Sequence, residues 1–127
     1  MLLDTSILVR HLTGEPADQA GRATTFLRNA ESLELPSLIV AELVCVLESV
    51  YEQTRSQVAA LVRSVLAHPP VYAPEEAVLL RAIELYETVR VHYAEAYLAA
   101  AAERRDGLVA SFDRDLDRVD GLTRVEP

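Results

Sequence analysis

Lysine is absent from this chain, and all 12 of its positively charged residues are arginine. With 20 acidic residues, the formal net charge is −8. That charge argues against tight binding of nucleic acid through a broadly basic surface, although bound metal ions would offset part of it. Arginine suits two-pronged contacts with phosphate. A codon bias in a GC-rich genome would give the same composition, so the arginines alone do not indicate a function.

Cysteine and histidine are too few for the usual zinc or nucleophilic sites. The only cysteine, Cys45, cannot form a disulfide within the chain, and we expect it in the core because it lies in the apolar run 38–47. His11, His68 and His92 are scattered along the sequence. No spacing typical of a Cys/His metal site exists, and no catalytic triad is supported.

Long hydrophobic runs are also missing. No segment reaches the roughly 18 to 20 apolar residues of a membrane-spanning helix, and no basic stretch precedes the apolar N-terminus as in a signal peptide. We therefore expect a cytoplasmic protein without a membrane segment. At 127 residues, half of them hydrophobic, residues 1–127 are expected to form one compact domain.

Short apolar segments alternate with helical patterns along the chain. Strands are expected at residues 2–3, 33–35, 71–73, 108–112 and 122–125. Helices are expected from about residue 5 to 13, 16–29, 37–51, 56–67, from 74 onward, and 93–104, with Thr5 or Ser6 capping the first and Ser37 the third. This alternation predicts an α/β fold with a central, mainly parallel sheet flanked by helices.

Four acidic residues stand in otherwise apolar stretches: Asp4, Glu42, Glu95 and Asp113. Charged side chains are rarely buried unless they are paired or bind metal. Asp4 and Asp113 directly follow predicted strands, at the carboxyl ends where parallel sheets bind ligands. Glu42 and Glu95 lie on the apolar sides of predicted helices. Together the four residues predict a single site for divalent cations.

Each acid also has a plainer interpretation. Asp4 suits the N-cap of the following helix, and Glu42 could pair with an arginine. Glu95 could be a partly exposed acid near a helix N-terminus, where the helix dipole favours negative charge. Asp113, with the acids that follow it, could cap a helix in the same way. The metal interpretation therefore depends on the four residues as a set.

Carboxylate oxygens suit Mg²⁺ or Mn²⁺ rather than Zn²⁺, and two such ions would balance four negative charges. A pair of these ions can activate water, hold a phosphodiester for in-line attack and stabilise the leaving oxygen. Ser6 and Ser111 could orient waters or metal ligands. Their alternative role is to cap a helix or bond the end of a strand.

Four short segments surround the four acids: residues 1–10 (MLLDTSILVR), 41–43 (AEL) after Pro36 and Ser37, 94–100 (AEAYLAA) and 111–116 (SFDRDL). These segments resemble PIN-domain ribonucleases, especially the VapC toxins of bacterial toxin–antitoxin pairs. Each segment is short, but the set occurs in the family's order and covers essentially the whole chain. The resemblance implies a PIN-like fold over residues 1–127.

The resemblance also implies a function. It implies an Mg²⁺- or Mn²⁺-dependent endoribonuclease toxin with one or two ions, a tRNA-like substrate and a cognate antitoxin whose extended C-terminal part lies across the site. A homodimer is expected as well. The implied metal ligands are Asp4, Glu42, Glu95 and Asp113, with Asp115 as an auxiliary ligand.

One departure from the family leaves an alternative open. Glu95 stands where the family usually has Asp, so its carboxylate reaches one methylene further. The alternative is a catalytically weak or inactive PIN-like module that acts by binding RNA or protein. A receiver domain, which also has acids at strand ends, needs a lysine late in the chain and is excluded because there is none. No base-reading motif identifies the RNA.

Overall fold

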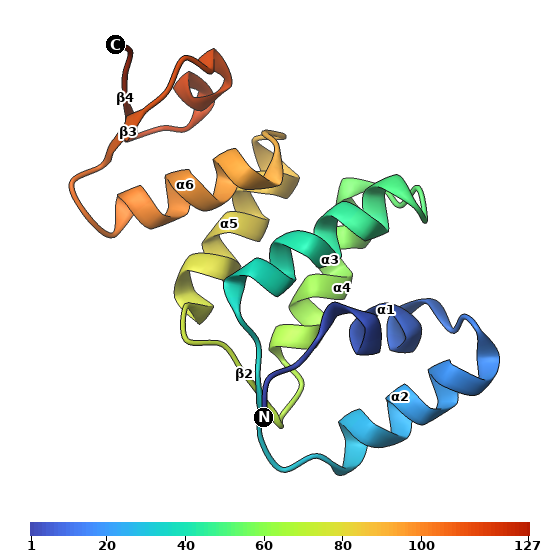
Figure 1. Cartoon of the computed structure of the whole chain (residues 1–127). Helices are drawn as coiled ribbons and strands as arrows, with labels where there is room; N and C mark the ends of the chain where they lie inside the picture. The colour runs from blue at the N-terminus through green and yellow to red at the C-terminus, as the bar shows by residue number, and fades with distance from the viewer. The chain divides into compact units, whose positions relative to one another are not determined.

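A computed structural model describes residues 1–127, in which the chain forms two compact units, Met1–Glu76 and Ala77–Pro127. Both units combine helices with short parallel strands, so the predicted α/β class with parallel pairing is confirmed. Figure 1 shows the elements along the chain. No helix is long and apolar enough to cross a membrane.

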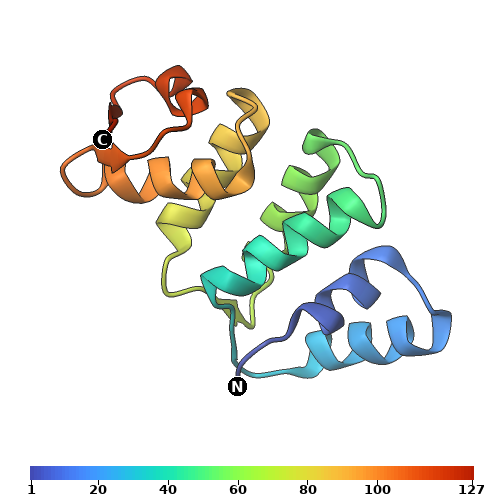
Figure 2. The same ribbon diagram turned by 45° about the horizontal axis from the view of Figure 1, so that its top comes forward.

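The first unit contains four helices and two named strands. In chain order these are α1 (Thr5–Thr13), α2 (Ala17–Asn29), β1 (Leu33–Glu34), α3 (Ser37–Ser49), α4 (Arg55–Leu66) and β2 (Val71–Tyr72). Figures 1 and 2 both show α2 returning alongside α1, and α4 returning alongside α3. Gly14 ends α1, because it adopts the left-handed conformation (φ +73°) that glycine accepts most easily.

The N-terminal segment runs beside β1, and this pairing decides where α1 and α3 begin. Leu3 donates its backbone N–H to Glu34 O at 2.9 Å, and Glu34 donates to Met1 O at 2.8 Å. On its other side β1 pairs in parallel with β2, with Leu33 opposite Val71. Because parallel strands share their carboxyl edge, α1 and α3 start at the same edge and come into contact.

Leucine and valine side chains from all four helices build the core of the first unit. Leu8 of α1, Leu27 of α2, Leu47 of α3 and Val58 of α4 are at most 2% exposed. On α3 the buried residues are Val40, Leu43, Val44 and Leu47. The helix therefore turns one apolar face inward and leaves the other at the surface.

Two capping predictions are wrong in detail. The N-cap of α1 is Asp4, and neither Thr5 nor Ser6 takes that role. Ser37 is the first residue of α3 after the N-cap Pro36, and its hydroxyl donates to Glu75 Oε1 at 2.6 Å. In both cases a carboxylate accepts the hydrogen bond of the hydroxyl that was expected to cap the helix.

The second unit holds the remaining elements: α5 (Glu76–Thr88), which begins at the last residue of the first unit, α6 (Tyr93–Glu103), β3 (Leu108–Ala110), the 3₁₀ helix η1 (Arg114–Arg118) and β4 (Thr123–Val125). The rings of Tyr86 on α5 and Tyr93 on α6 meet edge to face, with centroids 6.2 Å apart. Both residues are buried, as are most alanines of α6.

β3 and β4 form a parallel pair, with Val109 opposite Arg124. Residues 111–122 connect them through η1, and α6 packs against β3. All strands are shorter than expected, and the first predicted strand is only an isolated bridge between Leu2 and Glu34. The sheet is correspondingly small, with parallel pairs in each unit.

Cys45 is exposed, so the prediction of a core cysteine is wrong. It shares the outward face of α3 with Leu38, which is 77% exposed, and with Glu42. Residues 38–47 are apolar on nearly every side of the helix, so the sequence pattern does not show which face packs inward.

Candidate active site

Asp4 stands where the N-terminal segment ends and α1 begins. Its Oδ2 accepts hydrogen bonds from both the backbone N–H and the hydroxyl of Ser6, so the N-cap interpretation is confirmed. The hydroxyl bond, followed by the backbone bonds, lowers the pKa of Asp4 below its ordinary value. Asp4 is exposed and charged at neutral pH, which leaves its carboxylate accessible to a cation.

Glu42 lies in the second turn of α3 and reaches back to the start of α1. Its Oε2 accepts a 2.8 Å hydrogen bond from Thr5 Oγ1, and none of the ion pairs includes it. Glu42 is exposed, so the expected cost of burying it does not exist. The alternative of an arginine partner is not realised either.

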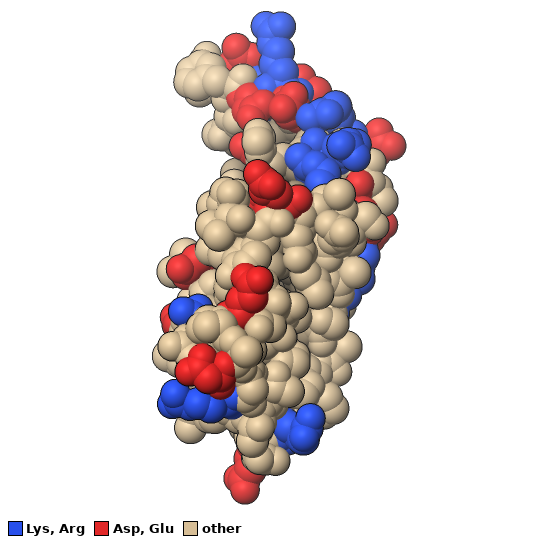
Figure 3. Space-filling view, turned by 90° about the vertical axis from the view of Figure 1, so that its right-hand side faces the viewer, with Lys and Arg blue, Asp and Glu red and all other residues tan.

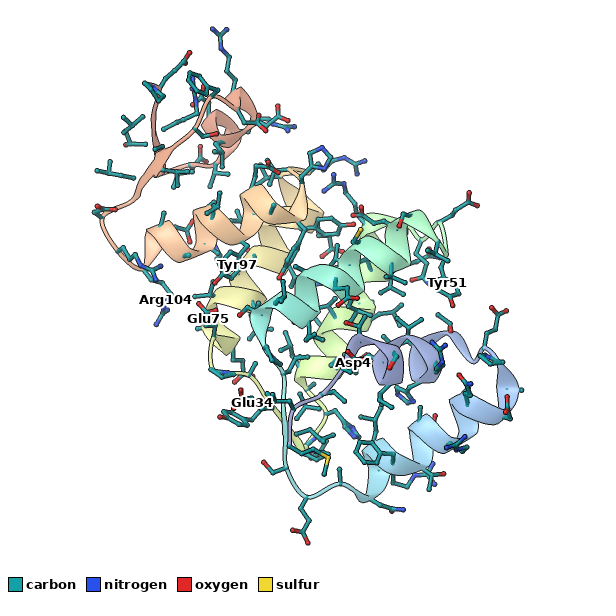
Figure 4. The ribbon with its side chains drawn as sticks, in the orientation of Figure 1. Asp4, Glu34, Tyr51, Glu75, Tyr97 and Arg104 are labelled. Carbon is teal, nitrogen blue, oxygen red and sulfur yellow. The ribbon has the colours of Figure 1, made fainter.

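Asp4 and Glu42, the two predicted metal ligands of the first unit, line the same hollow. It has a volume of about 270 Å³, and its lining includes Asp4, Ser6, Glu42 and Tyr51. Figure 4 labels Asp4 at the start of α1 and Tyr51 beyond the end of α3. Two carboxylates predicted from distant parts of the sequence are therefore brought together by the shared starting edge of α1 and α3.

Glu95 lies in the first turn of α6 and is half-buried. Its Oε2 is buried and has no hydrogen-bond partner. A buried carboxylate oxygen without a partner is costly in any protein. This atom is therefore the strongest sign in the second unit of a ligand that the polypeptide itself does not supply.

Asp113 follows β3 and caps η1. Its Oδ1 accepts the backbone N–H of Asp115 at 2.9 Å, and its own N–H donates to Ser111 Oγ at 2.9 Å. Ser111 therefore shapes the turn that presents Asp113. The carboxylate of Asp115 lies 3.4 Å from Arg118 in an exposed ion pair.

Arg124 of β4 holds this turn from the other side. Its guanidinium donates to Ser111 O at 3.0 Å and to both carboxylate oxygens of Asp117, at 3.0 and 3.3 Å. A fourth bond reaches Glu126 at 2.8 Å. The side chain is only 11% exposed, so it joins β4, η1 and the turn before Asp113. The bonds from Arg124 lower the pKa of Asp117.

Each unit supplies two of the four predicted metal ligands, Asp4 and Glu42 in one and Glu95 and Asp113 in the other. Within neither unit do three or more acidic, histidine or cysteine side chains gather closely enough to hold a metal. The donors are all carboxylate oxygens, the class that Mg²⁺ and Mn²⁺ prefer. The unpartnered Oε2 of Glu95 also fits a metal ligand.

Sequence reasoning missed two supporting residues. Thr5 was expected only as a cap, yet it is 4% exposed and bonds Glu42. Arg124 carried no signal except its place in the predicted strand 122–125. A buried hydroxyl directly after an acid, and an arginine in a short strand, become informative only when their partners are known.

The family model of the PIN domain matches residues 1–122, so it includes both units. The chain belongs to the PIN domain family. A search of curated proteins gave no match to this chain.

Membership defines the general class of activity. PIN domains are generally metal-dependent nucleases that typically use divalent ions such as Mg²⁺, and the family is associated with RNA. The chain therefore has a nuclease fold of the hydrolase class.

Proposed function

We propose that this chain is an Mg²⁺- or Mn²⁺-dependent endoribonuclease and that residues 1–127 act as one PIN-like domain. The observation that carries the proposal is the setting of three of the predicted ligands. Asp4 and Glu42 line one hollow of the first unit, while Glu95 in the second unit presents a buried, unpartnered oxygen. Carboxylate oxygens that bind divalent ions are what metal-assisted hydrolysis of a phosphodiester requires.

In this proposal Asp4, Glu42, Glu95 and Asp113 bind one or two divalent ions, with Asp115 as an auxiliary ligand. The bound ion supplies Lewis-acid stabilisation of the charge that develops at the phosphodiester. Ser6 orients the carboxylate of Asp4 through its hydroxyl, and Ser111 orients the backbone of Asp113. Thr5 fixes one oxygen of Glu42.

The test compares charge-removing variants with matched controls. Asparagine caps a helix about as well as aspartate, so Asp4→Asn keeps the α1 cap while it removes the charge. Asp120→Asn is the control, because Asp120 is exposed and is not one of the proposed metal ligands. Cleavage of labelled bulk tRNA in Mn²⁺ is expected to fall by at least about 100-fold in Asp4→Asn and to stay unchanged in Asp120→Asn. Undiminished cleavage by folded Asp4→Asn would refute the assignment.

The biological role that we propose is that of a toxin inhibited by a cognate antitoxin. This part rests on the ordered PIN motifs and on charge, since a chain with net charge −8 suits an arginine-bearing inhibitor. Expression of the chain is expected to stop growth of a bacterial host, and Asp4→Asn is expected to relieve the arrest. Co-expression of a small reading frame directly upstream should also relieve it.

We also propose that the toxin is a homodimer, as the resemblance to VapC toxins suggests. Sedimentation analysis of the full chain gives the mass directly. A monomer at micromolar concentration would exclude the dimer and leave the nuclease proposal untouched.

The alternative is a PIN-like module that acts by binding RNA or protein with little or no catalysis. It is favoured by one feature, Glu95 at the position where the family usually has Asp. A folded, partner-free protein that binds neither Mn²⁺ nor Mg²⁺ and does not cleave RNA would support this alternative.

A further inference from the structure

A second hollow adjoins the acidic one on the first unit, between α1 and α2. It has a volume of about 480 Å³, and its lining includes Ser6, Arg10, Gln19, Arg22 and Phe26. Ser6 and Arg10 line both hollows, so the two are neighbours along α1. Figures 1 and 2 show the two helices lying side by side over this stretch.

The two arginines of this hollow are available to an anion. Arg10 donates its Nε to Gln19 Oε1, which holds the guanidinium against α2. No carboxylate pairs with Arg10 or with the exposed Arg22. A guanidinium without a carboxylate partner is well suited to bind phosphate in a two-pronged contact.

An aromatic side chain lies next to these arginines. Phe26 follows Arg22 by one helical turn on α2 and is 38% exposed. It lines this hollow and the adjoining groove, which also contains Asp18. Basic groups combined with an exposed aromatic ring are the usual means of binding single-stranded nucleic acid. The negative charge of Asp18 marks the far limit of the basic stretch.

We propose that the hollow between α1 and α2 binds single-stranded RNA beside the acidic site, with phosphates at Arg10 and Arg22 and one base against Phe26. The inference rests on the proposed nuclease function, because RNA bound between α1 and α2 would lead to the carboxylates of the acidic hollow. Arg10 lies about 6 Å along α1 from Ser6, given a helical rise of 1.5 Å per residue. An RNA strand bound at the acidic hollow would therefore pass close to Arg10.

A single strand fits better than a duplex, because a base can reach Phe26 only when it is unstacked. The net charge of −8 opposes RNA binding at long range, so binding has to come from local contacts. Figure 3 shows acidic and basic side chains interspersed with much uncharged surface on the face it displays. RNA binding by this chain then depends on a few placed arginines, and Arg22 is the clearest of them.

The test measures RNA binding without cleavage. The probe is a short fluorescein-labelled oligouridylate, titrated with the full chain in EDTA at several KCl concentrations. Arg22→Ala is expected to weaken binding and to reduce the slope of log K against log[KCl] by about 0.7, the value for one single-strand phosphate contact. Arg28→Ala is the matched control, because Arg28 is exposed on α2 but lines neither hollow.

Phe26→Leu separates stacking from charge. It is expected to weaken binding by about 5- to 150-fold, the loss of one base–aromatic contact, and to leave the salt slope unchanged. Arg22→Gln repeats the charge removal if Arg22→Ala does not fold, with circular dichroism as the check on folding.

Equal affinities for Arg22→Ala and Arg28→Ala would overturn the inference. Displacement of the RNA by an oligoglutamate peptide of the same total charge would also overturn it, in favour of an acidic protein segment as occupant. Failure of the nuclease proposal looks different: Arg22→Ala would weaken binding in EDTA while the wild-type chain cleaves no RNA in Mn²⁺. Cleavage by the wild type with no effect of Arg22→Ala would reject the hollow alone.

Discussion

Thr5 Oγ1 donates a 2.8 Å hydrogen bond to Glu42 Oε2, which joins the first residue of α1 to the second turn of α3. Thr5 is buried, whereas Glu42 is exposed. The bond therefore does little to compensate for burial of the acid. Its effect is to fix the direction of the Glu42 carboxylate beside Asp4 in their common hollow.

Thr5→Val should uncouple this carboxylate from α1. Valine keeps the branched shape but lacks the hydroxyl, and Glu42 can bond water instead, so the free energy of unfolding should change by no more than about 1 kcal/mol. Mn²⁺ affinity, measured by isothermal titration calorimetry, is expected to fall about 10- to 100-fold because an orienting partner of a ligand is lost. Thr5→Ser retains the hydroxyl and should bind Mn²⁺ like the wild type. Wild-type affinity in Thr5→Val would remove Thr5 from the site.

The two faces of α3 should respond oppositely to the same substitution. Leu47 is 0% exposed and Leu38 is 77% exposed. Leu47→Ala leaves a cavity in the core and is expected to lower the free energy of unfolding by about 2–5 kcal/mol. Leu38→Ala should change it by less than about 0.5 kcal/mol. Urea unfolding followed by circular dichroism measures both, and similar losses would mean that α3 buries a different face.

Acid should weaken the fold partly through Asp117. Its hydrogen bonds from Arg124 hold its pKa below the ordinary value, so the folded state binds a proton less readily than the unfolded chain. The resulting stabilisation is complete above the unfolded pKa of about 3.9 and is lost as the pH falls through the lower folded pKa. The urea midpoint of Asp117→Asn should therefore fall less than that of the wild type below about pH 4.

Asp120→Asn is the control for this acid dependence and should follow the wild-type profile, because Asp120 is exposed and accepts no hydrogen bond from Arg124. Some acid dependence should remain in Asp117→Asn, since the pKa of Asp4 is also lowered by its bonds from Ser6. Parallel profiles for the wild type and Asp117→Asn would contradict the prediction.

The alternation of strands and helices was predicted well from the sequence. The faces of the helices that pack inward were predicted less well. The apolar segments at residues 33–35 and 71–73 predicted parallel strands because they alternate with helical patterns, and the two segments do pair in parallel. Strand lengths were overestimated. Pro36 has no N–H to donate to a ladder, so pairing of β1 ends where α3 begins.

The environments predicted for the candidate site residues differ in part from those in the structure. Asp4 and Glu42 line one hollow as a site would require, yet neither is buried. The argument from misplaced charge was therefore wrong for Glu42, because α3 is apolar on most sides and its packing partners decide which side is inside. For Glu95 the expected burial is found in part, since the residue is half-buried and one of its oxygens has no hydrogen-bond partner.

Glu95→Gln tests that oxygen directly. An uncharged amide is cheaper to bury than a carboxylate without a partner, so the metal-free variant should melt no lower than the wild type. At an Mn²⁺ concentration 100 times Kd, binding should stabilise the wild type by about 2.7 kcal/mol, and the rise in Tm should be lost in Glu95→Gln. Glu31→Gln, at an exposed position outside the site, should keep the full rise.

Glu95→Asp completes the series, because it keeps the charge and shortens the reach by one methylene. We expect it to retain a rise in Tm with Mn²⁺, since a carboxylate remains available to the ion. A Glu95→Gln variant that is stabilised by Mn²⁺ as much as the wild type would show that this carboxylate does not bind metal. Asp4, Glu42 and Asp113 would then have to hold the ion without it.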